Sequence, residues 1–401
     1  MKPIIFIPGI QATSLVNANT FDFNYIWNAY DTLGSSISTS ILGAYLEETL
    51  QLNPLYDTGT ETITERGHIA KLPYENAIIK LKRKLNNTDE YKNTPVYLFG
   101  YDWRMSNMES GKKLFLFVAY LKEKLKGQNV EGFRFITHSM GGLVLSCYLT
   151  QLKDDFSDID KIVINAPPFL GSPYALVHMV KGDGGFRSIL NWAIGRNEDM
   201  RKTIRTYPGV FELLPIYKDA LTYSEDNTAL NLLQKKYWQS NIYDDINELF
   251  DARLQLLNQF RSPSGMKDLA LLPKAVRDKM VIVVGTDKKK GTFTKVKVAK
   301  RHKDIENFID LTSLKTLSQS GDGTVPFVSS SIYAASIKTL AVEKQNFFEE
   351  TSNSLDFHGL FLKDSRVQNI IERYLLCDDA DPTIPNLKNW WETPDDSVKR
   401  I

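Results

Sequence analysis

One serine, Ser139, lies in the pattern that constrains the fold most strongly. A short apolar stretch, residues 133–137, runs into the turn His138-Ser139-Met140-Gly141-Gly142, and a helical pattern follows over residues 143–152. This order is typical of a nucleophile elbow, a tight strand-to-helix turn that lifts a serine hydroxyl out of the edge of a parallel sheet. The stretch therefore predicts a parallel sheet that carries a reactive serine at one edge.

Small residues are needed beside Ser139, because the strand and helix backbones nearly touch in such a turn. Gly141 and Gly142 meet that requirement. Thr137, in contrast, stands where the usual G-x-S-x-G pattern has its first glycine. The motif is incomplete, so a catalytic role for Ser139 requires partners elsewhere in the chain.

Two residues downstream supply those partners. A histidine must take the proton of the serine, and a carboxylate must hold that histidine in one tautomer. Asp322 lies between two glycines, and His358 follows the last strand pattern. The order serine, acid, histidine is that of the α/β-hydrolase fold. We therefore predict this fold, a mostly parallel sheet with helices on both faces, with Ser139 as nucleophile, Asp322 as acid and His358 as base.

Asp287 and His138 are the alternatives for acid and base. Asp287 follows a strand pattern that ends at Gly285, but the lysines beside it favour a solvated hairpin. His138 is next to the nucleophile in sequence, and an elbow sends neighbouring side chains in different directions. Of the five histidines, only His358 lies after Asp322. We favour Asp322 and His358, and we interpret His138 as part of the turn.

Acyl transfer from a serine also needs donors for the developing oxyanion, each contributing roughly 3–4 kcal/mol. The backbone N–H of Met140, the residue after the nucleophile, is the first candidate. The second should come from the loop after an early strand. Pro8-Gly9-Ile10-Gln11 has that position, and Gly9 would let the chain turn and leave the N–H of Ile10 free. A plain Pro-Gly turn is the alternative interpretation.

Apolar runs alternate with helical patterns along the chain, which predicts parallel βαβ construction. The expected sheet strands are residues 4–7, 96–99, 133–137, 161–165, 281–284 and 339–342. Helical spacing marks residues 114–125, 186–194, 230–238 and 367–376.

Two excursions interrupt this alternation and predict the domain organisation. We expect residues 1–173 and 280–401 to form the hydrolase core, with a cap-like excursion at about 11–75. Residues 174–279 show helical patterns and no clear sheet strand. They should form an inserted cap or lid, because insertions at strand ends carry specificity in such folds.

Composition excludes several partners and cofactors. The 401 residues carry 49 basic and 48 acidic side chains, a net charge of +1, so nothing points to nucleic acid. Two cysteines are too few for a disulfide framework, and no cluster has the spacing of metal ligands. Neither a signal peptide nor a run of ~18 apolar residues is visible. We expect a cytoplasmic protein that needs no metal or organic cofactor.

Further motifs resemble the lecithin:cholesterol acyltransferase family, which includes lysosomal phospholipase and phospholipid:diacylglycerol acyltransferase. The matching pieces are Pro8-Gly9-Ile10, Ile26-Trp27, Tyr101-Asp102-Trp103-Arg104, His138-Ser139-Met140-Gly141, Ala166-Pro167-Pro168-Phe169-Leu170-Gly171-Ser172-Pro173, Arg205-Thr206-Tyr207-Pro208, Leu213-Leu214-Pro215, the Asp322 loop and His358. The resemblance implies a capped α/β hydrolase acting on glycerolipid acyl esters, with the triad and oxyanion donors named above. The chain lacks the cysteine pair that staples the cap in extracellular and lysosomal members.

Three segments are candidates for contact with lipid. Trp27 lies in the early excursion, where the resemblance suggests acyl-chain contact and an ordinary core tryptophan is the alternative. Leu190 and Trp192 belong to an apolar stretch that fits a lid or a helix packed on the core. Residues 288–303 carry eight basic and no acidic side chains. In this basic segment Lys288, Lys289 and Lys290 could meet anionic headgroups, or the segment could be a solvated hairpin.

Together these features predict a serine-dependent lipid acyl-ester hydrolase or O-acyltransferase that works through a seryl acyl-enzyme. Its substrates would be glycerophospholipids or acylglycerols, reached by peripheral contact with a lipid surface. Two alternatives remain: an esterase for small soluble esters, and a catalytically silent hydrolase fold used for binding. The intact set of Ser139, Asp322 and His358 argues against the silent fold.

Overall fold

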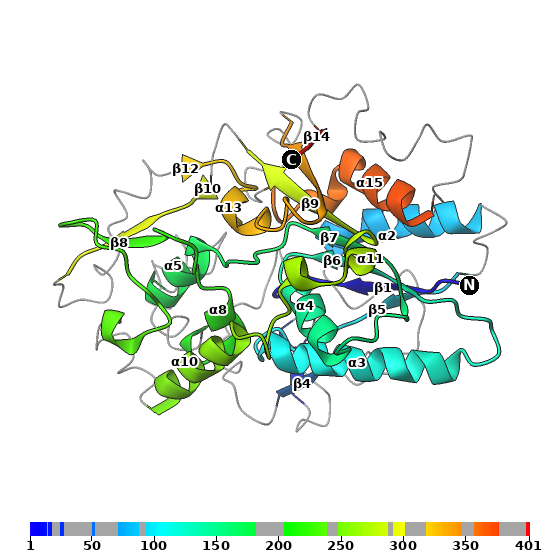
Figure 1. Cartoon of the computed structure of the whole chain (residues 1–401), viewed down its shortest axis with the longest axis horizontal. Helices are drawn as coiled ribbons and strands as arrows, with labels where there is room; N and C mark the ends of the chain where they lie inside the picture. The colour runs from blue at the N-terminus through cyan, green and yellow to red at the C-terminus, as the bar shows by residue number, and fades with distance from the viewer. Residues whose placement is uncertain are drawn as a thin grey trace.

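A seven-stranded sheet forms the centre of the computed structural model (Figure 1). The structure describes residues 1–13, 15–17, 25–27, 50–52, 71–87, 94–181, 204–238, 248–287, 292–300, 318–345, 357–376 and 398–401. The strands lie in the order β14 (Val398–Arg400), β13 (Lys338–Glu343), β9 (Met280–Thr286), β7 (Ile159–Asn165), β6 (Phe133–His138), β1 (Ile4–Ile7) and β5 (Val96–Leu98).

The sheet is parallel from β13 to β5, and all six predicted strands belong to it. Among the described strands of this sheet, only β14, at the edge, is antiparallel, pairing with β13. The six were predictable because parallel strands are buried on both faces and read as continuous apolar runs. The sequence of β14 holds one buried valine, Val398, before two charged residues, and gave no such signal.

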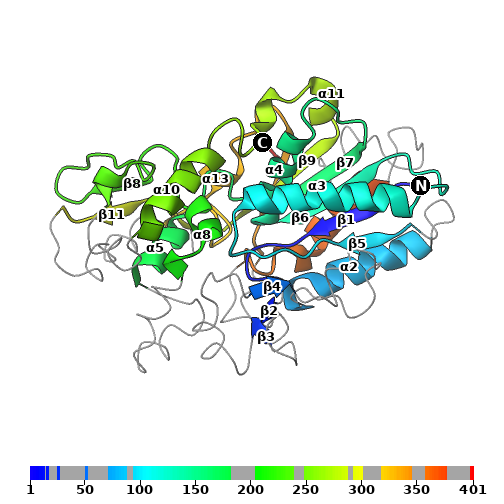
Figure 2. The ribbon, with the colours of Figure 1, turned by 90° about the horizontal axis from the view of Figure 1, so that it is seen from below.

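Helices cover both faces of the sheet (Figure 2). Residues of β1 alternate: Ile5 and Ile7 pack on the side of α3 (Asn107–Lys124) and α4 (Gly141–Gln151). Ile4 and Phe6 pack on the side of α2 (Lys71–Asn86) and α15 (Ser365–Leu376). The helices predicted at 114–125 and 367–376 are therefore confirmed as α3 and α15. The two apolar layers fix the carboxyl ends of the parallel strands along one edge.

Several short elements lie between α5 (Pro173–Lys181) and β9 in the chain. They are α8 (Pro208–Glu212), β8 (Leu221–Tyr223), η2 (Lys235–Tyr237), α10 (Glu248–Phe260), η3 (Leu269–Leu271) and α11 (Lys274–Arg277). Of these, α8, α10 and β8 lie beside the sheet, whereas α11 lies against it (Figure 1). The helix predicted at 230–238 is wrong, because only the 3₁₀ turn η2 forms there. Asn231 Oδ1 accepts the N–H of Leu233, and such side-chain bonds compete with helix formation. The pattern at 186–194 lies outside the described residues.

Three small sheets complete the described fold. The strands β2 (Leu15–Asn17), β3 (Tyr25–Trp27) and β4 (Leu50–Leu52) form one, and β10 (Thr292–Phe293) pairs with β12 (Ser318–Gln319). In the third, β11 (Val296–Val298) pairs in parallel with β8. In β11 two buried valines flank the more exposed Lys297, and the strand takes part in a long-range pairing, not in a local hairpin.

Candidate active site

The predicted elbow lies between β6 and α4, with Ser139 at its tip. Ser139 has a φ of +52°, in the left-handed region, and its N–H donates to the carbonyl oxygen of Asn165 at 2.8 Å. A Cβ on Gly141 would lie 2.4 Å from the carbonyl oxygen of Ile7 on β1. The turn therefore passes too close to the neighbouring strand for any side chain at position 141.

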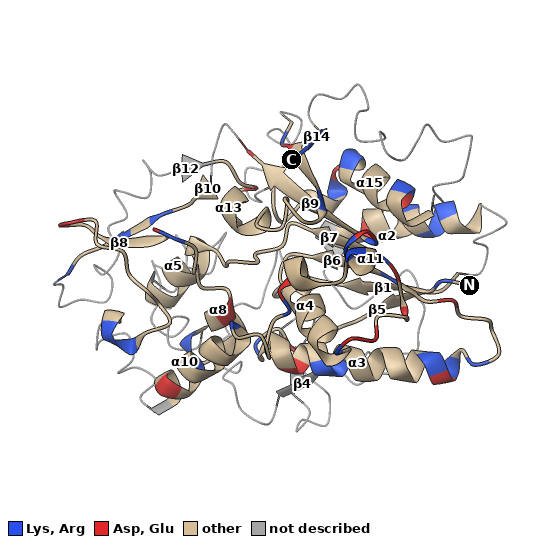
Figure 3. Cartoon of the chain, in the orientation of Figure 1, with Lys and Arg blue, Asp and Glu red and all other residues tan. Residues whose placement is uncertain are grey.

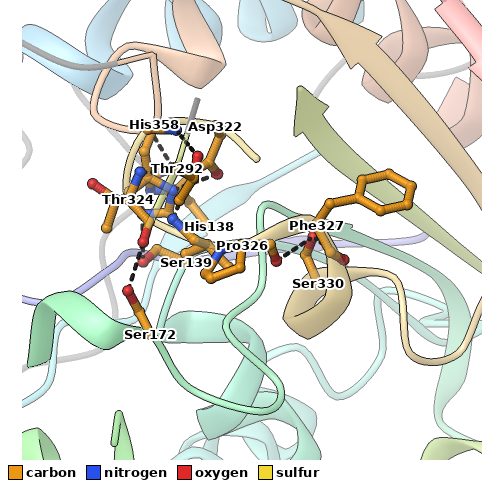
Figure 4. Close-up of polar contacts among 12 residues, drawn as sticks. His138, Ser139, Ser172, Thr292, Asp322, Thr324, Pro326, Phe327, Ser330 and His358 are labelled. Atoms are coloured by element: carbon orange, nitrogen blue, oxygen red, sulfur yellow. Dashed lines mark hydrogen bonds and ion pairs between the residues drawn. The ribbon is translucent and has the colours of Figure 1, made fainter. Parts of the chain in front are cut away.

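The hydroxyl of Ser139, the ring of His358 and the carboxylate of Asp322 form a continuous hydrogen-bonded chain (Figure 4). His358 Nδ1 lies 2.7 Å from Asp322 Oδ2, and His358 Nε2 lies 2.8 Å from Ser139 Oγ. Because a carboxylate only accepts, Nδ1 carries the proton, and Nε2 of the neutral ring accepts from the serine. All three residues are buried. This arrangement can withdraw the proton of a serine as its oxygen attacks.

Asp322 is oriented by its own loop, residues 321–326, and by two distant hydroxyl groups. Its Oδ1 accepts hydrogen bonds from the N–H of Thr324 at 3.1 Å and of Val325 at 2.7 Å. The N–H of Gly323, the next residue after Asp322, donates to Thr292 Oγ1 at 2.9 Å. Ser172 Oγ donates to the carbonyl oxygen of Thr324 at 2.6 Å. Sequence reasoning missed Thr292 and Ser172, which lie 31 and 152 positions from their partners.

The alternative acid, Asp287, is engaged elsewhere. Its carboxylate lies 3.3 Å from Lys344 Nζ, and both side chains are buried. Its N–H donates to the carbonyl oxygen of Gly321. The lysines that suggested a solvated hairpin after Asp287 lie outside the described residues, but Asp287 itself belongs to a buried ion pair.

The two predicted oxyanion donors lie on the loop after β1 and on the elbow. Gly9 brings this loop against the nucleophile, since a Cβ on Gly9 would be 3.0 Å from Cβ of Ser139. Within the part of the chain that is described, no group accepts a hydrogen bond from the backbone N–H of Ile10 or of Met140. Both amides are thus available at the edge where the serine hydroxyl lies.

His138 contacts the site from behind the nucleophile. Its Nδ1 lies 2.9 Å from Tyr74 Oη on α2, and its Nε2 lies 3.1 Å from the carbonyl oxygen of His358. Burial, and then the neighbouring His358, lower the pKa of His138 well below its usual value. His138 therefore does not face Asp322, and His358 holds the place between acid and nucleophile.

Tyr74 was missed at the sequence level, although a signal was present. Tyr74, Ile78, Leu81 and Leu85 follow one another at helical spacing, and all four are buried in the layer beneath α2. Their spacing predicts the buried face of a helix. The hydroxyl of Tyr74, the first of the four, reaches His138, the residue before Ser139.

Of the predicted lipid-contact residues, one lies in the part of the chain that the structure describes. Trp27 lies on β3, and Leu190, Trp192, Lys288, Lys289 and Lys290 lie outside the described residues. In the remainder of the basic segment, Lys300 Nζ lies 2.5 Å from Asp226 Oδ2. Lys and Arg residues also occur on α3, α10, α11 and α15 (Figure 3).

Over the described ranges, no three His, Cys, Asp or Glu residues are grouped so as to hold a metal ion. No helix in those ranges is both long enough and apolar enough to cross a bilayer.

Comparison with known proteins gives a family and a fold. The model of the family described as Lecithin:cholesterol acyltransferase matches residues 59–269, more than half of the chain. An Arabidopsis thaliana protein named Phospholipase A(1) LCAT3 is 29% identical over 135 residues, and that match covers 31% of this chain and 28% of the relative. The solved structure titled "The crystal structure of Tle4-Tli4 complex" is 18% identical, with a TM-score of 0.63 over 94% of this chain and 99% of that one. The predicted α/β-hydrolase fold is confirmed.

Proposed function

The chain belongs to the lecithin:cholesterol acyltransferase family, and we propose that it is a serine-dependent lipid acyl-ester hydrolase or O-acyltransferase. The observation that carries the proposal is the hydrogen-bonded chain from Ser139 through His358 to Asp322. A fold used only for binding has no need of a buried chain in this order.

In the proposed reaction, Ser139 Oγ attacks the acyl carbonyl carbon while His358 Nε2 takes the hydroxyl proton. The tetrahedral intermediate collapses, the ester bond breaks, and His358 returns the proton to the departing alcohol. A second hydroxyl compound, water or an acceptor alcohol, then attacks the acyl carbon and gives its proton to His358. The bond between the acyl carbon and Ser139 Oγ breaks, and His358 returns that proton to Ser139. Asp322 holds the ring in the required tautomer and stabilises the imidazolium formed in each half.

The negative charge of both tetrahedral intermediates would be held by the N–H groups of Ile10 and Met140. Two observations support this assignment. The Gly9 loop lies close to Ser139, and neither amide has a hydrogen-bond acceptor among the described residues. Removal of one such donor slows acyl transfer by roughly 10²–10³. Nothing in this arrangement calls on a metal or an organic cofactor.

Glycerophospholipids and acylglycerols are the substrates that we propose. The family match and the name of the Arabidopsis relative support a lipid acyl ester as the reacting group. The choice between water and an alcohol as acceptor depends on access to the acyl-enzyme, so hydrolysis and O-acyl transfer are alternatives for the same serine.

We also propose that residues 174–279 form a cap on a core made of residues 1–173 and 280–401. The position of α5, α8, α10 and β8 to one side of the sheet supports this division (Figure 1). Trp27, Leu190 and Trp192 would then contact the acyl chain. Lys288, Lys289 and Lys290 would contact anionic headgroups when the protein binds a lipid surface, at about 1 kcal/mol per well-placed lysine.

Labelling with a fluorophosphonate tests the central proposal. The wild-type protein should be labelled at Ser139 and should release fatty acid from phospholipid or acylglycerol, or transfer it to an added alcohol. The variant Ser139→Ala should lose both labelling and turnover while its melting temperature is unchanged. Turnover that survives in this variant would refute the nucleophile, and turnover of acetyl esters alone would leave a small-ester esterase.

A further inference from the structure

A hydrogen-bonded path links the oxyanion loop to the base through two side chains that take no part in the proposed chemistry. The N–H of Gly9 donates to Tyr74 Oη at 3.1 Å, and Tyr74 Oη lies 2.9 Å from His138 Nδ1. His138 Nε2 lies 3.1 Å from the carbonyl oxygen of His358. We call this path the Tyr74–His138 bridge. It touches the loop of Ile10, the residue before Ser139 and the backbone of His358.

The direction of each hydrogen bond follows from what the end groups can do. The carbonyl oxygen of His358 can only accept, so Nε2 of His138 carries a proton. The N–H of Gly9 can only donate, so Tyr74 Oη accepts there and has its own proton to give to His138 Nδ1. The bridge is therefore fully paired when His138 is the neutral tautomer with its proton on Nε2.

Burial favours the same protonation state. The pKa of His138 is lowered well below its usual value by burial, then by the nearby His358, and burial raises the pKa of Tyr74. The rings of His138 and His358 lie 5.0 Å apart between centres. A positive charge on His138 would oppose the imidazolium that forms on His358 during acyl transfer, whereas a neutral His138 does not.

The base is held from two sides. From the acid loop, the backbone carbonyl oxygen of Asp322 accepts a hydrogen bond from the N–H of His358 at 2.9 Å. Its carboxylate oxygen Oδ2 accepts another from His358 Nδ1 at 2.7 Å. From the elbow, His138 donates to the carbonyl oxygen of the same residue. The second contact fixes the distance between the base and Ser139, because His138 and Ser139 are adjacent in the chain.

We propose that Tyr74 and His138 are positioning residues, which hold His358 and the Gly9 loop at their working distances from Ser139 through the neutral bridge. The inference rests on the proposed function. In this proposal His138 positions the base, and Tyr74, on α2, positions the oxyanion loop.

Two substitutions at His138 separate the two ends of the bridge. His138→Gln keeps an amide N–H near the place of Nε2 and can still donate to His358. His138→Asn keeps an amide oxygen near the place of Nδ1 and can still accept from Tyr74, but it loses the contact with the base. The asparagine variant should lose about 100-fold in kcat, the effect of a shift of about 1 Å in a catalytic group. The glutamine variant should retain most of the rate, and KM should be unchanged in both.

Tyr74→Phe tests the other end. This variant removes the acceptor of the Gly9 N–H and the donor to His138, so kcat should fall while KM stays the same. Tyr148→Phe is the matched control, because Tyr148 is a buried tyrosine whose hydroxyl has no hydrogen-bond partner among the described residues. It should keep the wild-type kcat.

The protonation state gives a readout that a merely structural role would not predict. The chain has five histidines, so nitrogen-15 labelling of histidine and NMR can follow each ring, with His138→Gln assigning its signal. In the wild type, His138 should be the Nε2–H tautomer and should stay neutral well below pH 6.5. In Tyr74→Phe the signal of Nδ1 should shift, because it loses its donor.

Three outcomes would overturn the inference. The first is an equal loss of kcat in His138→Asn and His138→Gln, in proportion to the fall in their melting temperatures. The others are a wild-type kcat in Tyr74→Phe and a His138 ring that titrates near pH 6.5. Each would leave the proposed function intact, provided that the fluorophosphonate still labels Ser139. Failure of that labelling in the wild type would instead remove the proposed function itself.

Discussion

The elbow and the acid loop meet at His358 but are held in different ways. The elbow is fixed by backbone: Ser139 has a positive φ, and Gly141 lies where a Cβ would be 2.4 Å from the carbonyl oxygen of Ile7. The acid loop is fixed largely by side chains, through Asp322 itself, Thr292 and Ser172. A change that disturbs the backbone of the elbow should therefore appear mainly as lost stability, and the loss of a side chain that supports the acid loop mainly as lost rate.

The acid itself gives the largest expected effect. Asp322→Asn should lower kcat by about 10⁴, because an amide favours the wrong tautomer of the histidine. Asp287→Asn should leave kcat near the wild-type value. It should lower the free energy of unfolding by about 3–5 kcal/mol, since Lys344 would be left buried without its partner.

For both variants, turnover of a soluble ester measures the effect on kcat, and urea unfolding measures the effect on the free energy of unfolding. The same unfolding curve for Asp322→Asn as for the wild type would agree with its task of orienting His358. A large loss of kcat in Asp287→Asn, with a small one in Asp322→Asn, would reverse the acid assignment.

The elbow gives the next largest effect, and here the change is in stability. In Gly141→Ala the new methyl group would press on a backbone carbonyl that cannot turn away, so β1 and the elbow must separate. The free energy of unfolding should fall by about 3 kcal/mol, at the upper end for overpacking.

Gly127→Ala is the control for an added methyl group that meets no neighbour, because Gly127 has a positive φ and no atom within 4 Å of an added Cβ. It should cost only the backbone strain, about 1 kcal/mol. Equal losses in the two variants, measured by urea unfolding, would show that the close approach to β1 contributes nothing to the elbow.

The same contrast explains what the sequence could predict. The elbow and the six strands were predictable because their constraints are local: glycines where backbones touch, and apolar runs in buried strands. Ser139, Asp322 and His358 could be proposed from chain order, and the structure brings them within hydrogen-bond reach. Thr292 and Ser172 could not, because a hydroxyl that bonds a backbone group far along the chain leaves no periodic signal.

Two errors have the same origin. Residues 230–238 have helical spacing, but Asn231 and Trp238 satisfy backbone groups with their side chains, and a turn forms instead. A solvated hairpin was one interpretation of the basic segment, but its strand β11 pairs with β8, whose first residue, Leu221, lies opposite Val296. In both cases the competing interaction was specific to the tertiary structure.

The smallest expected effect tests the support of the acid loop. Thr292→Val keeps the shape of the side chain but leaves the N–H of Gly323 without its acceptor. The free energy of unfolding should fall by about 1 kcal/mol, a typical value for one hydrogen bond. We also expect kcat to fall by about tenfold, because misplacing the group that orients the base raises the reaction barrier.

Thr150→Val separates these two contributions. The hydroxyl of Thr150, on α4, donates to the carbonyl oxygen of Gly265, far in sequence from the acid loop. Its loss should lower the free energy of unfolding by about the same 1 kcal/mol and leave kcat unchanged. If both valine variants kept the wild-type kcat, the acid loop would hold Asp322 without help from Thr292. A loss of rate confined to Thr292→Val would show instead that the acid, unlike the nucleophile, depends on side chains brought from another part of the chain.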